Sequence, residues 1–367
     1  MQIEAVRAIP FSIPYKKPLR FASGQVDVAD HVLVQVVTSD GVVGNAEAPP
    51  RPYTYGETQA SIVAVVRDLF APAVTGLSVL DRELARARMV RTVGNPTAKA
   101  AVDMAMWDAW GKTVGQPVHR LLGGFTDGLQ VSHMVGFDDP DVMAAEAARI
   151  RAEFGITSFK VKVGRRPIHD DVAVCRALRE ELGPDVELYL DGNRGWTSSE
   201  SADALRRLAD VGLSRVEELC PADDVLGRRW LVERCDVPFV ADESVPTPAD
   251  VTRELLAGSA TAISLKTART GFSDSLRIAY LAEGIGAEVV IGNQIDGQVG
   301  SACALAFGAA LRSTSRYAAE LSNFLDMADD LLTEPLRIER GRMAVRPGAG
   351  IGFEVDEDKL RHYRDDR

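Results

Sequence analysis

The stretch PDVMAAEAARIRAEFGITSFKVKV (residues 140–163) joins an amphipathic helical pattern to a short β-branched strand. The same alternation of helix and strand continues along the chain from about residue 130. Eight short apolar or β-branched runs are candidate strands, at 131–136, 157–163, 186–191, 214–219, 238–242, 262–266, 288–292 and 316–321. Seven or eight βα units at this spacing favour a parallel barrel over the alternative, an open doubly wound sheet.

The first third of the chain has a different pattern. Strands are expected at Ala5–Ile13 and His31–Thr38, with a hairpin turn at residues 39–41. Helices are expected at about Tyr55–Phe70 and at Asn95–Val114, since Gly115 and Pro117 follow the second pattern. These elements predict a small α+β domain before the barrel.

Composition and charge exclude several classes of protein. The 367 residues include 53 acidic and 42 basic side chains, and a net charge of −11 argues against a duplex nucleic-acid partner. Glu4 and Arg7 leave the N-terminal residues without the uninterrupted apolar core of a signal peptide. The longest apolar run (301–311) is too short to cross a bilayer. We therefore expect a cytoplasmic protein with neither a nucleic-acid nor a membrane partner. The four cysteines are too scattered for a disulfide framework or a zinc site: Cys175, Cys220, Cys235 and Cys303.

Charged residues close most of the predicted barrel strands. They are Lys160 and Lys162 on the second strand, Asp191 on the third, Glu217 on the fourth, Asp242 on the fifth and Lys266 on the sixth. The C-terminal ends of parallel barrel strands converge on one face, where active sites form. A single polar residue at a strand end commonly caps the next helix, but successive carboxylates flanked by lysines make that explanation weaker.

Three carboxylates aimed at one point repel each other unless a divalent cation lies between them. Oxygen ligands without cysteine or histidine favour Mg²⁺, or Mn²⁺, over zinc. A metal flanked by lysines is also typical of proton chemistry beside a carboxylate. The metal holds the enolate oxygens, and a lysine of lowered pKa moves the proton.

These residues carry a resemblance to a known family. The chain resembles the enolase superfamily in its muconate lactonizing enzyme subgroup, whose pattern is Lys-x-Lys, Asp, Glu, Asp and Lys on successive strands. A second similarity is the segment AKAAVDMAMWDAWGKTVGQPVHRLLGG (98–124), which looks like the helix that leads into the family's barrel. The resemblance covers nearly the whole chain. It implies a (β/α)7β barrel, a modified TIM barrel, with an N-terminal α+β capping domain that the C-terminal tail completes.

The resemblance also implies domain limits and residue roles. The capping domain is expected at 1–126, the barrel at 127–325, and the segment that returns to the capping domain at 326–367. Asp191, Glu217 and Asp242 would bind the metal, while Lys162 and Lys266 would face each other across the substrate as acid and base. Lys160 would add charge beside the substrate carboxylate. Asn193 and Glu320 are further candidates for substrate binding, and Glu320 matches a glutamate of the muconate enzymes.

Two positions depart from the family's pattern. Leu219 stands where the family usually has proline two residues after the metal-binding glutamate, which leaves Glu218 as an alternative to Glu217. Glu217 is preferred because its register fits. Asp296 stands where relatives often have glutamate, so the floor of the pocket is expected to differ.

The family match fixes the shared enolate chemistry better than it fixes the substrate. No histidine lies in the seventh strand, which argues against the mandelate racemase type, and no Asp-x-Asp pair lies in the eighth, which argues against dipeptide epimerases. Muconate cycloisomerase, the N-acylamino-acid racemase or o-succinylbenzoate synthase group, and an unassigned epimerase remain. A binding protein without catalysis is disfavoured because all six polar strand-end residues are present.

The N-terminal loops favour muconate cycloisomerase among these candidates. In the superfamily such loops close over the barrel, and those here contain basic and phenolic residues, including Arg51 and Tyr53. Cations and phenols on a lid suit a small dicarboxylate whose second carboxylate points away from the metal. Lys162 is the preferred proton donor to the enolate and Lys266 is the alternative. Relatives are often oligomers, so we also expect a homo-oligomer.

Overall fold

The N-terminal part forms a three-stranded antiparallel sheet. In the computed structural model, which describes residues 1–21 and 24–365, its order is β1 (Ile3–Phe21), β2 (Gly24–Thr38) and β3 (Val43–Ala48). The predicted turn joins β2 to β3, and Gly41 takes the left-handed conformation there (φ 81°), which glycine adopts at little cost. Helix α5 (Pro96–Val114) packs on this sheet and is buried along most of its length, so the predicted α+β arrangement is confirmed.

The helix predicted at about Tyr55–Phe70 is wrong at its N-terminal end. Its first residue instead closes a single turn that ends at Gly56 (φ 77°), and a new helix starts after Thr58. The Thr58 side chain accepts a hydrogen bond from a backbone N–H of that new helix, so the local sequence stops one helix and begins another. The remaining elements here are α1 (Pro52–Tyr55), α2 (Gln59–Val65), a π-helical turn (Val66–Phe70), α3 (Ala71–Val74), α4 (Arg82–Met89) and α6 (Val118–Leu122).

The second part is the predicted barrel. Its parallel strands are β4 (Gly128–Val135), β5 (Ser158–Lys162), β6 (Glu187–Asp191), β7 (Val216–Glu217), β8 (Phe239–Ala241), β9 (Ala262–Leu265), β10 (Glu288–Ile291) and β11 (Ala319–Glu320). The helices between them are α7 (Pro140–Phe154), α8 (Ile168–Leu182), α9 (Ser198–Arg207), α10 (Val225–Val232), α11 (Pro248–Ala257), α12 (Thr267–Ile285) and α13 (Gln298–Gly308). Within the described residues this is a (β/α)7β order, as predicted.

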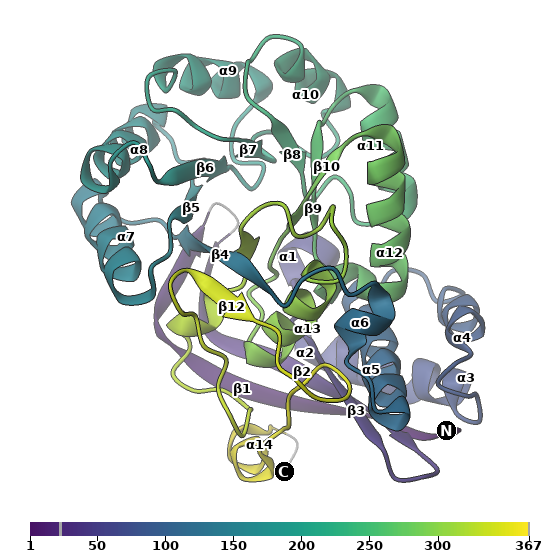
Figure 1. Cartoon of the computed structure of the whole chain (residues 1–367). Coiled ribbons are helices and arrows are strands. Elements are labelled where there is room, and N and C mark those ends of the chain that lie inside the picture. Colours follow the sequence, from purple (N-terminus) through teal and green to yellow (C-terminus); the bar gives the residue numbers. More distant parts are fainter. Residues whose placement is uncertain (22–23, 366–367) are drawn as a thin grey trace.

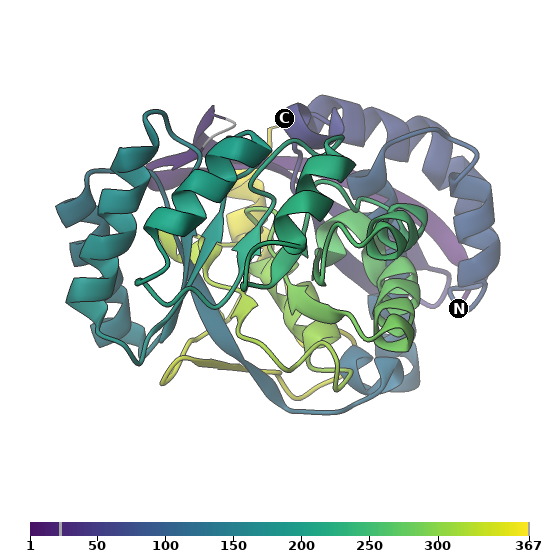
Figure 2. The ribbon, with the colours of Figure 1, turned by 90° about the horizontal axis from the view of Figure 1, so that it is seen from above.

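The barrel is nearly closed. Hydrogen-bonded pairing runs without a break from β10 through β4 to β11. Asn293, just after β10, joins the two ends of this path, because its side-chain amide donates to the Glu320 carbonyl at 3.0 Å. Helices α7 to α12 form an arc around the strands, and the purple sheet lies on the opposite side with both termini near it (Figure 1). Figure 2 looks down on this arc, with the purple strands behind the teal and green helices.

The C-terminal segment contacts both parts of the molecule. Strand β12 (Arg342–Ala344) pairs antiparallel with the start of β4, and helix α14 (Glu357–Tyr363) lies near β1. Arg364 forms an isolated antiparallel β-bridge with Phe11, and the Asp365 N–H donates to the Pro10 carbonyl at 3.0 Å. The proposed boundary at 126 falls between α6 and β4, whereas the one at 325 falls within a 3-10 turn (Asn323–Asp326).

Two buried carboxylates join the capping domain to the barrel. Glu47 on β3 accepts the backbone N–H groups of Gly297 (2.9 Å) and Gly300 (2.7 Å) at the start of α13. Asp103 on α5 accepts those of Phe272 (2.7 Å) and Ser273 (2.9 Å) in the middle of α12. Both carboxylates belong to the capping domain, and each accepts backbone N–H groups of a barrel helix. Hydrogen bonds therefore join the two parts of the molecule.

The Asp103 contact makes a stability prediction. Helix α12 is kinked at Gly271 (φ 61°), and Asp103 satisfies the N–H groups that the kink frees. Asp103→Ala is expected to lower the free energy of unfolding by about 2–4 kcal/mol, because buried donors lose their acceptor. Chemical denaturation measures this change. Exposed Asp210→Ala is the control and should change it by less than about 0.5 kcal/mol; equal destabilisation by both variants would contradict the prediction.

Two smaller expectations can be compared with the structure. Among the described residues, no helix is both long enough and apolar enough to span a membrane. All four cysteines are free thiols, and three of them are buried: Cys175, Cys220 and Cys303.

Candidate active site

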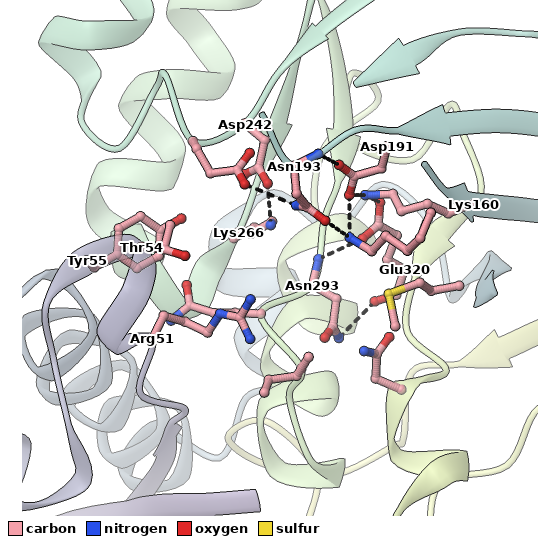
Figure 3. Close-up of a pocket in the computed structure, with 16 residues that line it drawn as sticks. Arg51, Thr54, Tyr55, Lys160, Asp191, Asn193, Asp242, Lys266, Asn293 and Glu320 are labelled. Atoms are coloured by element: carbon pink, nitrogen blue, oxygen red, sulfur yellow. Dashed lines mark hydrogen bonds and ion pairs between the residues drawn. The ribbon is translucent and has the colours of Figure 1, made fainter. Parts of the chain in front are cut away.

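Strand register brings the predicted charged residues together at the C-terminal end of the barrel. Lys162 on β5 lies opposite Asp191 on β6, and Asp191 lies opposite Glu217 on β7. Asp242 follows the end of β8 and Lys266 follows the end of β9. Lys160 and Lys162 share one face of β5, because side chains two residues apart on a strand point to the same side. The charged side chains converge above the strand ends (Figure 3).

Lys160 lies among three carboxylates in the barrel interior. Its Nζ is 2.9 Å from a Glu217 oxygen, 3.3 Å from an Asp191 oxygen and 2.5 Å from a Glu320 oxygen. Burial disfavours the ammonium form, but these carboxylates outweigh it and raise the pKa of Lys160. Lys160 is therefore a fixed positive charge in this arrangement.

Lys162 and Lys266 each hold a different carboxylate. Lys162 Nζ donates to Asp191 Oδ2 and to Asn193 Oδ1, both at 2.6 Å. Lys266 Nζ donates to Asp242 Oδ2, also at 2.6 Å. Lys266 and Lys160 lie on opposite sides of the site (Figure 3).

The pKa values in the site follow from burial and these ion pairs. Burial favours the neutral form of Asp191, but Lys162 and Lys160 lower its pKa to about 2. For Lys266, burial is outweighed by Asp242, so its pKa is raised. The lowered pKa predicted for the proton-transferring lysine is therefore not found at Lys266, because Asp242 contacts its ammonium group. A protonated lysine is nevertheless the form that can donate a proton.

The structure separates Glu217 from Glu218. Glu217 faces the interior beside Lys160, and burial raises its pKa. Glu218 has left-handed backbone (φ 37°) and turns away, accepting hydrogen bonds from the Asp242 N–H (2.7 Å) and the Ser244 hydroxyl (2.9 Å). Burial, with Glu243 nearby, raises the pKa of Glu218 to about 7. Glu218 thus supports the end of β8. Glu217 instead belongs to what we call the charged cluster, which consists of Lys160, Lys162, Asp191, Glu217, Asp242, Lys266 and Glu320.

The donor chemistry fits a divalent cation. Asp191, Glu217 and Asp242 offer only oxygen, and Glu217 Oε2 is buried without a hydrogen-bond partner. In the described part of the chain no group of three acidic, histidine or cysteine side chains is arranged to hold a metal ion, and lysine ammonium groups contact these carboxylates instead. Cation binding would therefore require the ammonium groups to withdraw from the carboxylate oxygens.

Residues 51–55, which we call the lid, do not all face the cavity. Arg51, Thr54 and Tyr55 line the cavity above the strand ends (Figure 3). Tyr53 lies outside it with 80% of its surface exposed and lines an outer cleft between residues 24–31 and 50–60. Arg51 and Ile295 line both spaces, so they separate the inner cavity from the outer cleft. The inner cavity, about 30 Å³, admits water but is far smaller than a typical substrate pocket, so the side chains or the lid must move before a substrate enters.

Several residues of the site were not predicted. The cavity is also lined by Met134, Glu243, Asn293, Gln294 and Asn323. Glu243 accepts the Asn193 side-chain amide at 3.0 Å, and its position directly after Asp242 was a signal in the sequence. Asp296, in contrast, is buried and does not line the cavity, and burial together with Glu47 raises its pKa to about 7. Asp296 accepts from the Gln294 N–H at 3.4 Å and its own N–H donates to Asn293 Oδ1 at 2.8 Å, so it acts on the cavity only through these two lining residues.

Comparisons with known proteins agree with this geometry. Residues 4–123 match the family described as mandelate racemase / muconate lactonizing enzyme, N-terminal domain, and residues 142–359 match the enolase C-terminal domain-like family. A solved structure of muconate lactonizing enzyme from Mucobacterium Smegmatis, complexed with muconolactone, is 65% identical with a TM-score of 0.98, and each chain is covered completely.

More distant relatives have two kinds of activity. Muconate cycloisomerase 1-2 of Acinetobacter lwoffii is 31% identical over 100% of this chain and 96% of its own length. L-Ala-D/L-Glu epimerase of Bacillus subtilis is 33% identical over 86% of this chain and 87% of its own. Relatives at similar identity are thus named for different activities.

Proposed function

The chain belongs to the mandelate racemase / muconate lactonizing enzyme family of the enolase superfamily and is an isomerase, and we propose that its substrate is cis,cis-muconate. The observation that carries this proposal is the 65% identity, over both complete chains, to the enzyme whose structure contains muconolactone. The site agrees in chemistry, since three carboxylates lie beside three lysines under a lid that contains Arg51. The reaction is an intramolecular lyase step that closes a lactone.

In the proposed reaction, one carboxylate of muconate adds to the diene of the same molecule. A carbon–oxygen bond forms, and the electron pair moves toward the second carboxylate to give an enolate, which then takes up one proton on carbon. A divalent cation, Mg²⁺ or Mn²⁺, held by Asp191, Glu217 and Asp242 would supply positive charge that stabilises the enolate. The buried ammonium of Lys160 adds to this charge.

The proton is assigned to Lys162, with Lys266 as the alternative donor. Asn193 accepts from Lys162 Nζ at 2.6 Å and thereby orients the ammonium group. Glu320 contacts Lys160 in the same way. Asn193 and Glu320 thus position Lys162 and Lys160. Contact of either residue with the substrate stays a prediction. Arg51 is the proposed partner of the carboxylate that adds to the diene.

Epimerisation or racemisation is the second candidate function, because the L-Ala-D/L-Glu epimerase is 33% identical. Lys162 and Lys266, which hold different carboxylates of the cluster, could serve proton exchange at an α-carbon as well as lactonisation. Exchange of the α-proton of dipeptides and N-acylamino acids for solvent deuterium distinguishes the two. We expect none at the enzyme concentration that converts muconate.

The proposed function is tested by following the diene absorbance of cis,cis-muconate with enzyme and Mg²⁺, and again with excess EDTA. Absorbance should fall with Mg²⁺ and stay constant with EDTA, because the enolate then loses the several kcal/mol of charge stabilisation that the cation would supply. Full activity in EDTA would contradict the proposed cation. No loss of absorbance under either condition, combined with α-proton exchange on a dipeptide or N-acylamino acid, would favour the second candidate.

A further inference from the structure

Arg269 is a buried cation that touches the charged cluster without lining its cavity. It lies in the first turn of α12, three residues after Lys266, and is 3% exposed. Its Nη1 donates to Asp242 Oδ1 at 3.0 Å and to the Asp242 carbonyl at 2.9 Å, and its Nη2 donates to the Ser264 carbonyl at 2.9 Å. The guanidinium therefore holds both the side chain and the backbone of Asp242.

These contacts divide the two oxygens of Asp242 between different partners. Oδ1 accepts from Arg269, and Oδ2 accepts from Lys266. The backbone N–H of the same residue donates to Glu218 at 2.7 Å. Asp242 is thus fixed at its backbone and at Oδ1 by groups outside the cavity, and Oδ2 is the oxygen that contacts Lys266.

Arg269 also contacts the lid. The Tyr55 hydroxyl accepts a hydrogen bond from Arg269 Nη1 at 2.8 Å, and the guanidinium carbon lies 5.7 Å from the centre of the Tyr55 ring. Tyr55 is the last residue of α1, a single turn that contains no buried residue and ends at the left-handed Gly56. A segment with so little buried surface opens at low cost in free energy, so one hydrogen bond to the barrel changes its position appreciably.

The two contacts meet on one nitrogen atom. The same Nη1 serves Tyr55 on the lid and Asp242 in the cluster, and a planar guanidinium can hold both acceptors in fixed directions as a lysine cannot. We propose that Tyr55 and Arg269 are positioning residues that couple closure of α1 to the orientation of Asp242 for cation binding. By reciprocity, a cation on Asp242 favours the closed lid as much as the closed lid favours the cation. This inference rests on the proposed function only in taking Asp242 as a cation ligand.

The test compares Tyr55→Phe with Tyr53→Phe, two changes that each remove one hydroxyl from the same helical turn. Mn²⁺ affinity is measured without substrate by the electron paramagnetic resonance signal of free Mn²⁺, and hydrogen–deuterium exchange is measured across residues 51–57 with and without Mn²⁺. In the wild type and in Tyr53→Phe, Mn²⁺ should slow exchange in this segment. In Tyr55→Phe the slowing should be lost, and Mn²⁺ should bind about five- to tenfold more weakly, at the low end of measured coupling between sites.

Arg269→Lys is the second variant, because it keeps a positive charge but loses the planar guanidinium, whose Nη2 bond to the Ser264 carbonyl holds Nη1 between Tyr55 and Asp242. It should lose the effect of Mn²⁺ on lid exchange, as Tyr55→Phe does. Suppose that Tyr55→Phe and Tyr53→Phe bind Mn²⁺ equally and that Mn²⁺ slows exchange in residues 51–57 equally in both. That result would overturn the coupling but not the proposed cation, and it does not depend on whether Arg269→Lys folds. A wild-type chain that binds no Mn²⁺ would overturn both the coupling and the proposed cation, whereas Mn²⁺ binding without muconate turnover would overturn only the proposed substrate.

Discussion

Lys162→Ala is expected to lower kcat for muconate lactonisation by about 10²- to 10⁴-fold, the contribution that a positioned acid or base usually makes. The reason is that the enolate formed on ring closure needs a proton on carbon, and Lys162 holds one at the end of β5. Asn193 and Asp191 keep its ammonium group in place, both at 2.6 Å. Initial rates at saturating muconate and Mg²⁺ measure the effect.

Lys359→Ala is the matched control for this prediction. Lys359 lies on α14 and pairs with Asp329 and Asp330, away from the cavity, so its loss should leave kcat unchanged within about twofold. Near-normal turnover by Lys162→Ala would show that Lys162 is not the acid. Loss of turnover in Lys266→Ala with retention in Lys162→Ala would instead assign the proton to Lys266, and the configuration of the product would then report the face of addition.

Glu217→Gln is expected to have the second large effect. The substitution keeps the size of the side chain but removes a charge from the carboxylates proposed to hold the cation. The buried Glu217 Oε2 has no hydrogen-bond partner, so it is an oxygen available to an ion. We expect Mg²⁺-dependent turnover to fall by about 10²-fold or more, because a cation supplies several kcal/mol of charge stabilisation in such reactions. Rates across a Mg²⁺ titration measure this change.

The neighbouring Glu218→Gln is the control for Glu217→Gln. Glu218 accepts hydrogen bonds from Asp242 and Ser244, and a glutamine oxygen can accept the same bonds. Its variant should therefore keep Mg²⁺ dependence and turnover close to those of the wild type. The opposite ranking of the two variants would mean that the fourth strand presents Glu218, not Glu217, to the cation.

The barrel and its charged cluster could be predicted because they follow from local rules. Strand periodicity places Lys160 and Lys162 on one face of β5, and parallel strands bring Asp191 and Glu217 to the same end of the barrel. The break between α1 and α2 is also encoded locally, at Gly56 and Thr58, whereas the helix predicted from the surrounding pattern runs through both positions.

The lid contacts could not be predicted in the same way, because they depend on how the two parts of the chain meet. Tyr53 and Tyr55 are the same type of residue in the same helical turn. Tyr53 is nevertheless exposed, whereas the Tyr55 hydroxyl accepts a hydrogen bond from Arg269, 214 positions away. Arg269 resembles any basic residue in the first turn of a helix until the fold places it between Asp242 and Tyr55. Burial in a shared interface, which sequence spacing does not report, decides these roles.

The proton NMR spectrum of the product formed from cis,cis-muconate in D₂O with Mg²⁺ tests the central claim most directly. Enolate protonation by a lysine that exchanges with solvent predicts muconolactone with one deuterium, on the carbon beside the free carboxylate and in a single configuration. Muconate recovered unchanged, or a lactone without deuterium, would contradict the proposed reaction.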